Sequence, residues 1–168
     1  MKAPQALLLV VATALTLASG ASVGAGPGAG PGAGATKQRV AITANLYPKR
    51  EFVLTPLHAG ALERDFGKAR MVYGTWSSTM RKGQHIEILR AFFTFEGKRG
   101  SLTIRERTEW VDAGVDSGGP SIATGNWEVV RGTGEYAQVA GGGRSAHSGL
   151  SGGTDPWYAR QEGFLSLP

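Results

Sequence analysis

The sequence predicts an all-β protein, built as an up-and-down barrel or as a sandwich. Apolar side chains recur at every second position in seven or more stretches between residues 39 and 167, which is the period of a half-buried strand. Glycine-rich turns separate these stretches. No amphipathic pattern longer than a turn or two of helix is present, and strands joined by short turns are typical of barrels and sandwiches.

Residues 1–21 are predicted to be a secretory signal peptide. Lys2 supplies a positive charge, residues 6–17 are apolar and uncharged, and residues 18–21 are small, which is the order that signal peptides follow. The apolar run is shorter than the roughly 20 residues needed to cross a membrane, so no membrane span is expected. The protein should therefore be secreted, to an extracellular or periplasmic space.

Residues 22–36 are predicted to be a flexible tether, and residues 37–168 a single β-barrel or sandwich domain. The tether repeats Gly, Ala and Pro and lacks the bulky apolar residues that offset chain entropy. The remaining chain is long enough for one domain with its own core. The chain has no cysteine, which excludes both disulfides and a lipid-anchored lipoprotein.

The first half of the domain should hold three strands. Alternation begins near residue 39 and ends before Pro48, which has no amide hydrogen to donate. Val72, Trp76 and Met80 recur on one side of a longer strand. The expected elements are strands over 39–46, 51–57 and 70–81, and a connecting loop with a helical turn at 58–68.

The second half should hold four or more strands. Residues 86–95 are apolar on both faces, which predicts a central strand that is covered on both sides. The tight turn at 96–100 reverses the chain. The remaining expected strands cover 101–111 and 122–131, one strand after Gly143, and a closing strand at 157–167.

A glycine-marked stretch runs from residue 125 to residue 143. Trp127 and Val129 share one face of a strand that Gly132 and Gly134 then interrupt, and such glycines mark positive φ or close backbone approach. Gly141 to Gly143 are expected to turn the chain sharply. A phosphate-binding loop is not favoured, because no amphipathic helix follows the glycines.

This stretch resembles the glycine-marked strand pair of the allene oxide cyclase and dirigent superfamily. Arg131 departs from the pattern, since it stands where the family usually has glycine. The resemblance implies an eight-stranded antiparallel barrel, commonly assembled into trimers, in which Gly132, Gly134 and Gly141 are structural. The residues that fit the pattern are Val130, Gly132, Thr133, Gly134, Tyr136, Val139 and Gly141; the closing strand and Gly60, Leu62, Asp65 and Gly67 match more loosely.

The chain is basic, with 18 Lys and Arg against 13 Asp and Glu. The basic residues are spread in pairs, which predicts a solvated face or attraction to an acidic surface polymer. A nucleic-acid partner is not expected, because the sequence has no recognition helix, zinc finger or aromatic RNA motif.

Motifs of metal or nucleophilic catalysis are not found, so no metal and no cofactor are predicted. His58, His85 and His147 lack metal-binding spacing and are interpreted as surface or turn residues. Ser145 lies near His147 without a nucleophile elbow. Asp112 and Asp116 are interpreted as parts of a plain turn.

Glu106 is the candidate catalytic residue. It shares the face of Leu102, Ile104 and Trp110, where a carboxylate costs several kcal/mol unless it is paired or neutralised. One interpretation is an ion pair with Arg90. The other is an internal pocket, lined by Arg90, Tyr73 and Trp110, in which Glu106 transfers protons.

The resemblance implies a barrel that holds a reactive or amphipathic small molecule, because enzymes of that superfamily are thought to cyclise or steer intermediates in an apolar interior. We therefore expect a secreted protein that binds a small apolar or amphipathic ligand, as a carrier, an isomerase or a cyclase. Two alternatives stay open: an extracellular binding module, and an assembly subunit whose barrel is filled by side chains.

Overall fold

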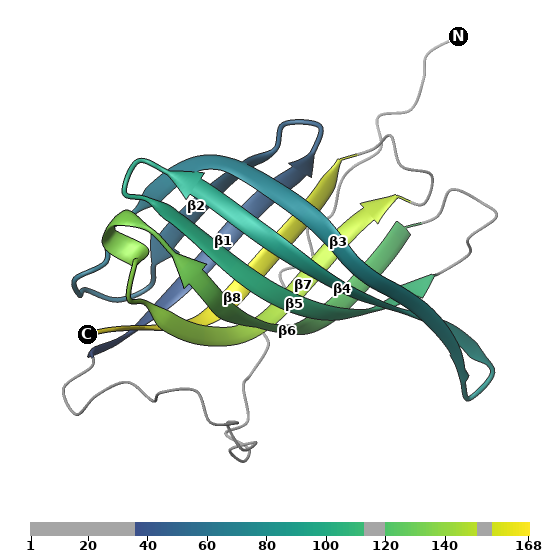
Figure 1. The fold of residues 1–168 in the computed structure, drawn as a ribbon. Helices are drawn as coiled ribbons and strands as arrows, with labels where there is room; N and C mark the ends of the chain where they lie inside the picture. The colour runs from purple at the N-terminus through teal and green to yellow at the C-terminus, as the bar shows by residue number, and fades with distance from the viewer. Residues whose placement is uncertain (1–35, 113–119, 151–155) are drawn as a thin grey trace, which may run out of the picture. The chain divides into compact units, whose positions relative to one another are not determined.

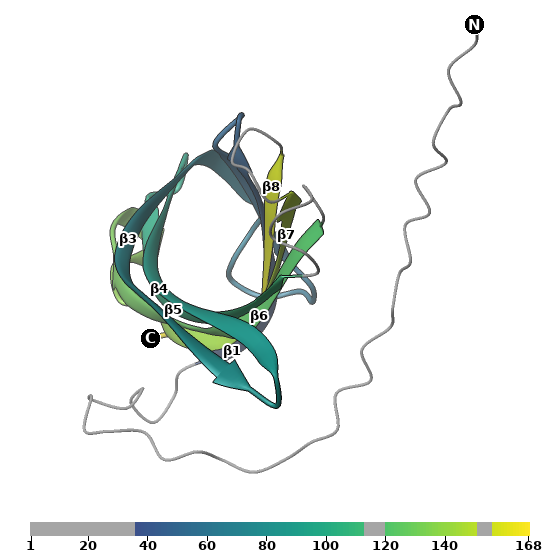
Figure 2. The same cartoon turned by 90° about the vertical axis from the view of Figure 1, so that its right-hand side faces the viewer.

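The computed structural model describes residues 36–112, 120–150 and 156–168, and within these ranges the chain forms one closed antiparallel barrel (Figures 1 and 2). Each strand pairs with the next, and β8 returns to pair with β1. The predicted all-β barrel of about eight strands is confirmed. The strands are β1 (Thr36–Tyr47), β2 (Glu51–Pro56), β3 (Asp65–Arg81), β4 (Gln84–Gly97), β5 (Ser101–Asp112), β6 (Pro120–Gly132), β7 (Ala140–Leu150) and β8 (Trp157–Leu167).

Most expected elements are found, with differences at their ends. The closing strand has the predicted bounds, while Thr36, expected to end the tether, is the first residue of β1 and pairs with Leu167. The expected helical turn at 58–68 is wrong: bends lead directly into β3 at Asp65. The predicted signal peptide and the rest of the tether lie outside the described residues. No described helix has the length and apolar character needed to cross a membrane.

The core lies inside the barrel and is built from alternate residues of every strand. Leu102, Ile104 and Trp110 are buried on the inward face of β5, as their spacing predicts. The prediction that residues 86–95 are covered on both faces is wrong, because Phe92 is 40% exposed. Only one face of a barrel strand meets the core, so apolar residues on the other face of β4 reach the surface.

Gly132, Gly134 and Gly141 of the marked stretch each stand where a side chain would not fit. Gly134 has φ +59, a conformation that side chains disfavour, and it opens the 3-10 turn η2 (Gly134–Tyr136). A Cβ on Gly132 would lie 1.8 Å from the Tyr136 carbonyl oxygen, and one on Gly141 would lie 2.2 Å from that of Phe164. Gly141 does not turn the chain, contrary to expectation: it belongs to β7, where it admits the close approach of β8.

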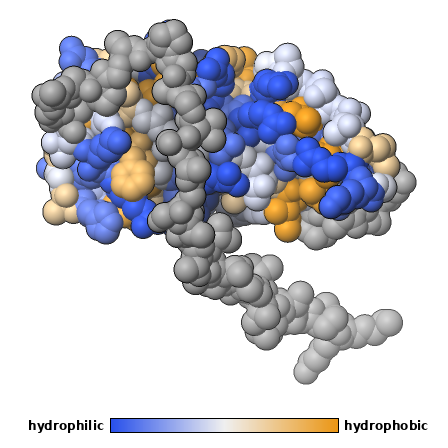
Figure 3. Space-filling model, turned by 90° about the horizontal axis from the view of Figure 1, so that it is seen from below, coloured by the Kyte–Doolittle hydropathy of each residue, from blue (hydrophilic) through white to orange (hydrophobic). Residues whose placement is uncertain are grey.

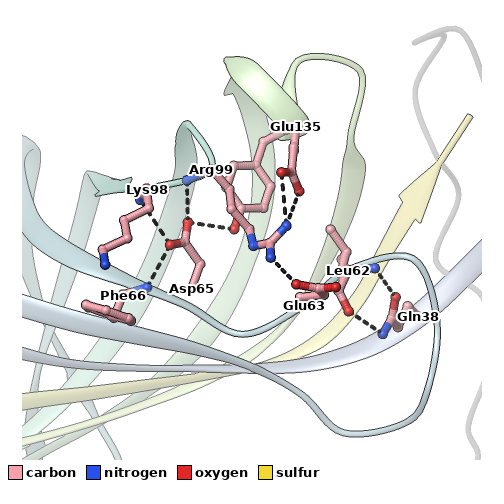
Figure 4. Close-up of polar contacts among 9 residues, drawn as sticks. Gln38, Leu62, Glu63, Asp65, Phe66, Lys98, Arg99 and Glu135 are labelled. Carbon is pink, nitrogen blue, oxygen red and sulfur yellow. Dashed lines mark hydrogen bonds and ion pairs between the residues drawn. The ribbon is translucent and has the colours of Figure 1, made fainter.

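One end of the barrel is held by a buried carboxylate. Asp65 accepts hydrogen bonds from the backbone N–H groups of Phe66, Lys98 and Arg99 at 2.8, 3.0 and 3.3 Å, and from the Tyr136 hydroxyl at 3.0 Å (Figure 4). The Arg99 guanidinium lies over this cluster and pairs with Glu135 and with Glu63. These contacts tie η2 and the turn between β4 and β5 to the start of β3.

Candidate functional site

Three polar side chains from separate strands meet inside the barrel. Glu106 on β5, His147 on β7 and Gln161 on β8 are 1%, 3% and 0% exposed. Small neighbours make room for the imidazole ring, because His147 lies between Ala123 of β6 and Ala159 of β8 in the sheet register. The barrel curvature thus brings together groups that are far apart in the sequence.

Both oxygens of the Glu106 carboxylate are engaged. His147 Nε2 makes a short hydrogen bond with Oε1, and Gln161 Nε2 donates to Oε2 at 3.1 Å. An isolated carboxylate in an apolar interior would be strongly unfavourable. The two partners supply the hydrogen bonds that allow the Glu106 carboxyl group to be buried.

Aromatic rings surround the imidazole of His147. The ring centroids of Phe93, Trp110 and Trp157 lie 5.7, 5.8 and 6.0 Å from that of His147. Trp110 Nε1 donates to Thr108 Oγ1 at 3.1 Å, which satisfies its polar atom. Such a buried, polarisable environment strengthens the electrostatic contacts inside it.

Four buried polar atoms around this cluster have no protein partner among the described residues. They are His147 Nδ1, Gln161 Oε1, Ser145 Oγ and Trp157 Nε1. Ser145 faces Gln161 directly across the β7–β8 ladder. Each buried group without a partner costs about 1–3 kcal/mol, so the site retains hydrogen-bonding capacity for a small polar group.

The arrangement is suited to proton transfer. A carboxylate that accepts from Nε2 fixes the orientation of the imidazole and the nitrogen that carries the hydrogen. Nδ1 is then an acceptor in the neutral ring and a donor in the imidazolium. Histidine held in this way by a carboxylate is a common general acid and base.

Two of the four predicted site residues lie at this site, and two do not. Glu106 and Trp110 point inward, as predicted. Arg90 is exposed on the outer face and lies opposite Arg107, so the predicted Glu106–Arg90 pair is wrong: Arg90 alternates with the inward-facing Leu89 and Ala91. Tyr73 is 58% exposed and does not line an enclosed pocket, although partial burial raises the pKa of its phenol.

Sequence reasoning misses His147 and Gln161. The interpretation of His147 as a surface or turn residue is wrong, because its side chain is 1% exposed. Strand β7 has the sequence AGGGRSAHSGL, whose small residues mark neither face as apolar. In β8, however, Ala159, Gln161, Gly163 and Leu165 recur at period two, and this alternation is a usable signal for the inward face.

A groove of about 670 Å³ on the same part of the barrel crosses β1, β2, β6, β7 and β8. It is lined by outward-facing residues such as Ile122, Tyr158 and Arg160, and by His147. The side chain of His147 is only 1% exposed, so the groove does not expose the imidazole. The groove and the interior site are therefore separate features.

Comparisons with protein-family models, with curated proteins and with solved structures found no match. The likeness to allene oxide cyclases and dirigent proteins thus stays a prediction drawn from the glycine-marked stretch. Within the described ranges, no group of three or more His, Asp or Glu side chains is arranged to hold a metal ion.

Proposed function

We propose that this protein is a secreted barrel, of the allene oxide cyclase and dirigent-like kind, that binds a small amphipathic molecule next to Glu106, His147 and Gln161. The observation that carries the proposal is the set of buried polar atoms without protein partners, on His147, Gln161, Ser145 and Trp157. A ligand's polar end would bond to these atoms, and its apolar part would pack against Trp110 and Trp157.

The composition of the site supports a ligand with both characters. Small-molecule sites are mostly apolar, with a few polar groups that orient the ligand. Here the Trp110 and Trp157 rings lie 5.5 Å apart, edge to face, beside a single polar cluster. An eight-stranded barrel has room for side chains and one small ligand.

A second function, isomerisation of the bound molecule, is favoured by the pairing of His147 with Glu106. Nε2 is held by the carboxylate while Nδ1 has no protein partner. Nδ1 would take a proton from one atom of the ligand and return it to another, while Glu106 stabilises the imidazolium in between. Such a step is balanced without any co-substrate, as an isomerase or an intramolecular cyclase requires.

The test is titration with 1-anilinonaphthalene-8-sulfonate, an amphipathic fluorescent probe, with Trp emission as a second readout. We expect saturable binding at one site per chain, weakened about tenfold or more by Gln161→Leu and by Trp110→Ala, a loss of about 1.4 kcal/mol. Tyr158→Ala is the matched control, because Tyr158 is an aromatic residue on the outer face, 51% exposed.

The proposal fails if folded parent protein shows no saturable binding, or if only Tyr158→Ala weakens it. The first result would favour a barrel filled by its own side chains, with a role in assembly. The second would move the ligand to the outer groove. Thermal melts of each variant show whether a loss of binding reflects a loss of fold.

A further inference from the structure

Most of the outer edge of β3 has no neighbouring strand. Strand β2 pairs with β3 only from Leu54 opposite Asp65 to Glu51 opposite Lys68. Ala69 N–H still donates to the Arg50 carbonyl oxygen at 2.8 Å. Beyond this bond, no described strand borders β3 on that side, and the β3–β4 hairpin extends past the neighbouring strands (Figure 1).

The free edge lacks the features that usually protect edge strands. Residues 71–80 contain no charged residue and no proline, whereas natural edges commonly carry charges, proline or an early end. Trp76 and Met80 are 53% and 64% exposed. Figure 3 shows hydrophobic residues at the surface between hydrophilic ones. On residues 71–80 of β3, exposed apolar side chains border unpaired backbone.

The charges at the two ends of this edge are already compensated. Arg70 pairs with Glu96 at 2.9 Å, and Arg81 pairs with Glu109 at 3.0 Å. Residues 71–80 carry no charge of their own with which to bind a polyanion or an acidic peptide. The edge is suited to an uncharged, extended segment.

The hairpin turn shows which backbone groups point to the free edge. Lys82 and Gly83 form a two-residue turn with φ +52 and +79, closed by the pair Arg81–Gln84. The closing pair of such a turn exchanges both of its hydrogen bonds, and these bonded pairs then recur at every second residue. Hence residues 75, 77, 79 and 81 bond to β4, and residues 76, 78 and 80 direct their N–H and C=O groups outward.

We infer that two copies of this protein pair through residues 75–81 of β3, antiparallel, about a two-fold axis at Ser78. In this register Ser78 faces Ser78, and Trp76 faces Met80 of the other copy. The outward backbone groups of both strands meet and form bonded pairs. Apolar side chains meet on one face, and Ser77 meets Thr79 on the other, which are favourable cross-strand pairs.

The sequence selects this register. Sliding one strand by two residues places Ser78 opposite Trp76 or opposite Met80, which separates the apolar pair. Larger slides run into the bulge at Gly74 in one direction, where the β3–β4 register shifts between Tyr73 and Thr75, and into the turn at Lys82 in the other. The described residues of each chain offer one such edge, so two chains form a closed dimer and further chains cannot add to it.

Association should be weak, because a pair of short strands buries less than the roughly 1,200–2,000 Å² of a stable interface. Sedimentation velocity on the mature chain, from about 1 μM to about 1 mM, should show a monomer–dimer equilibrium. Ser78→Lys and Ser78→Glu each place like charges opposite one another and should weaken dimerisation about tenfold or more. Mixing the two variants should restore the dimer, since residue 78 then faces the opposite charge.

Ser77→Lys is the matched control: it adds the same charge one residue away, on the other face, where it meets Thr79, and it should leave the dimer largely intact. Ser78→Pro removes an outward N–H without breaking a bond to β4 and should give a monomer with an unchanged melt. The inference would be overturned if the parent protein were monomeric at every concentration or formed a trimer. It would also be overturned if the mixture of Ser78→Lys and Ser78→Glu dimerised no more strongly than either variant alone.

Discussion

Glu106 and His147 share a short hydrogen bond at the centre of the barrel, with both side chains 1% exposed. They lie 41 residues apart in the sequence, on β5 and β7 with β6 between them. Breaking one half of a buried pair is more costly than replacing both halves. Comparing single and double variants of Glu106 and His147 therefore tests whether the pair is needed for stability or for function.

Glu106→Gln should cost about 1 kcal/mol of unfolding free energy. The introduced amide keeps the shape, its oxygen can accept from Gln161, and its N–H can donate to His147 Nε2 once the imidazole hydrogen moves to Nδ1. His147→Ala should cost about 3–5 kcal/mol, because it leaves the Glu106 carboxylate with one partner. Urea denaturation measures both, and equal losses would contradict the pairing described.

The double variant Glu106→Leu with His147→Phe should be as stable as the parent or up to about 4 kcal/mol more stable, since apolar residues of similar volume often replace a buried pair without loss. The same variant should lose binding of the anilinonaphthalene probe. If its stability instead fell by the sum of the losses of Glu106→Leu and His147→Phe measured singly, the two residues would not be energetically coupled.

Tyr136→Phe should reduce the sensitivity of the fold to alkaline pH. Burial, and then the charge and hydrogen bond of Asp65, raise the pKa of the Tyr136 phenol above its ordinary value, which is about 10. The stability that the protonated Tyr136 phenol contributes is fully present below the pKa that this phenol has in the unfolded chain. It is lost as the pH rises toward the higher pKa of the folded protein. Between about pH 9 and 12, the melting temperature of the parent should therefore fall more steeply than that of the variant.

At neutral pH the same change should cost about 1 kcal/mol, for the hydrogen bond to Asp65. Tyr158→Phe is the control, since Tyr158 is exposed on the outer face. If the melting temperatures of the parent and of Tyr136→Phe fell equally with pH between about pH 9 and 12, Tyr136 would not couple folding to pH.

Gly134→Val should destabilise the protein by about 3 kcal/mol or more. Its φ is +59, and a Cβ there would lie 2.3 Å from the Arg99 carbonyl oxygen, so backbone strain and overlap add. Gly83→Val is the matched control, because Gly83 also has positive φ but no atom within 4 Å of its Cβ. The control should lose only about 1–2 kcal/mol. If thermal melts showed that Gly134→Val and Gly83→Val lose equal stability, the close approach of the Arg99 carbonyl would not be the reason for glycine at position 134.

Export should yield a mature chain that begins near Ser22, because residues 1–21 have the order of a signal peptide. Limited proteolysis should then trim it to the start of β1 near Thr36 without loss of fold. Mass spectrometry of the protein from the culture medium measures both ends. Retention of Met1 in protein recovered from inside the cells would contradict export.

The period of two is enough to predict which side chains β5 buries. Leu102, Ile104, Glu106 and Trp110 share a face in any strand conformation, because successive side chains alternate. The glycines at 132 and 134 likewise predict the end of a strand from the sequence alone, since few residues other than glycine accept positive φ. The bounds of β8 follow from its own alternation.

The partner of Glu106 is decided by the tertiary structure alone. Arg90 lies on β4, the strand that precedes β5, yet it points outward, while His147 and Gln161 reach the carboxylate from β7 and β8. Which side chains meet inside a barrel depends on closure and on the register of every ladder, and a slip of one residue turns a strand's side chains to the opposite face. Local alternation decides which face of a strand is buried, but it does not decide which residue of the next strand lies opposite, because each ladder bonds backbone groups that are the same in every residue except proline.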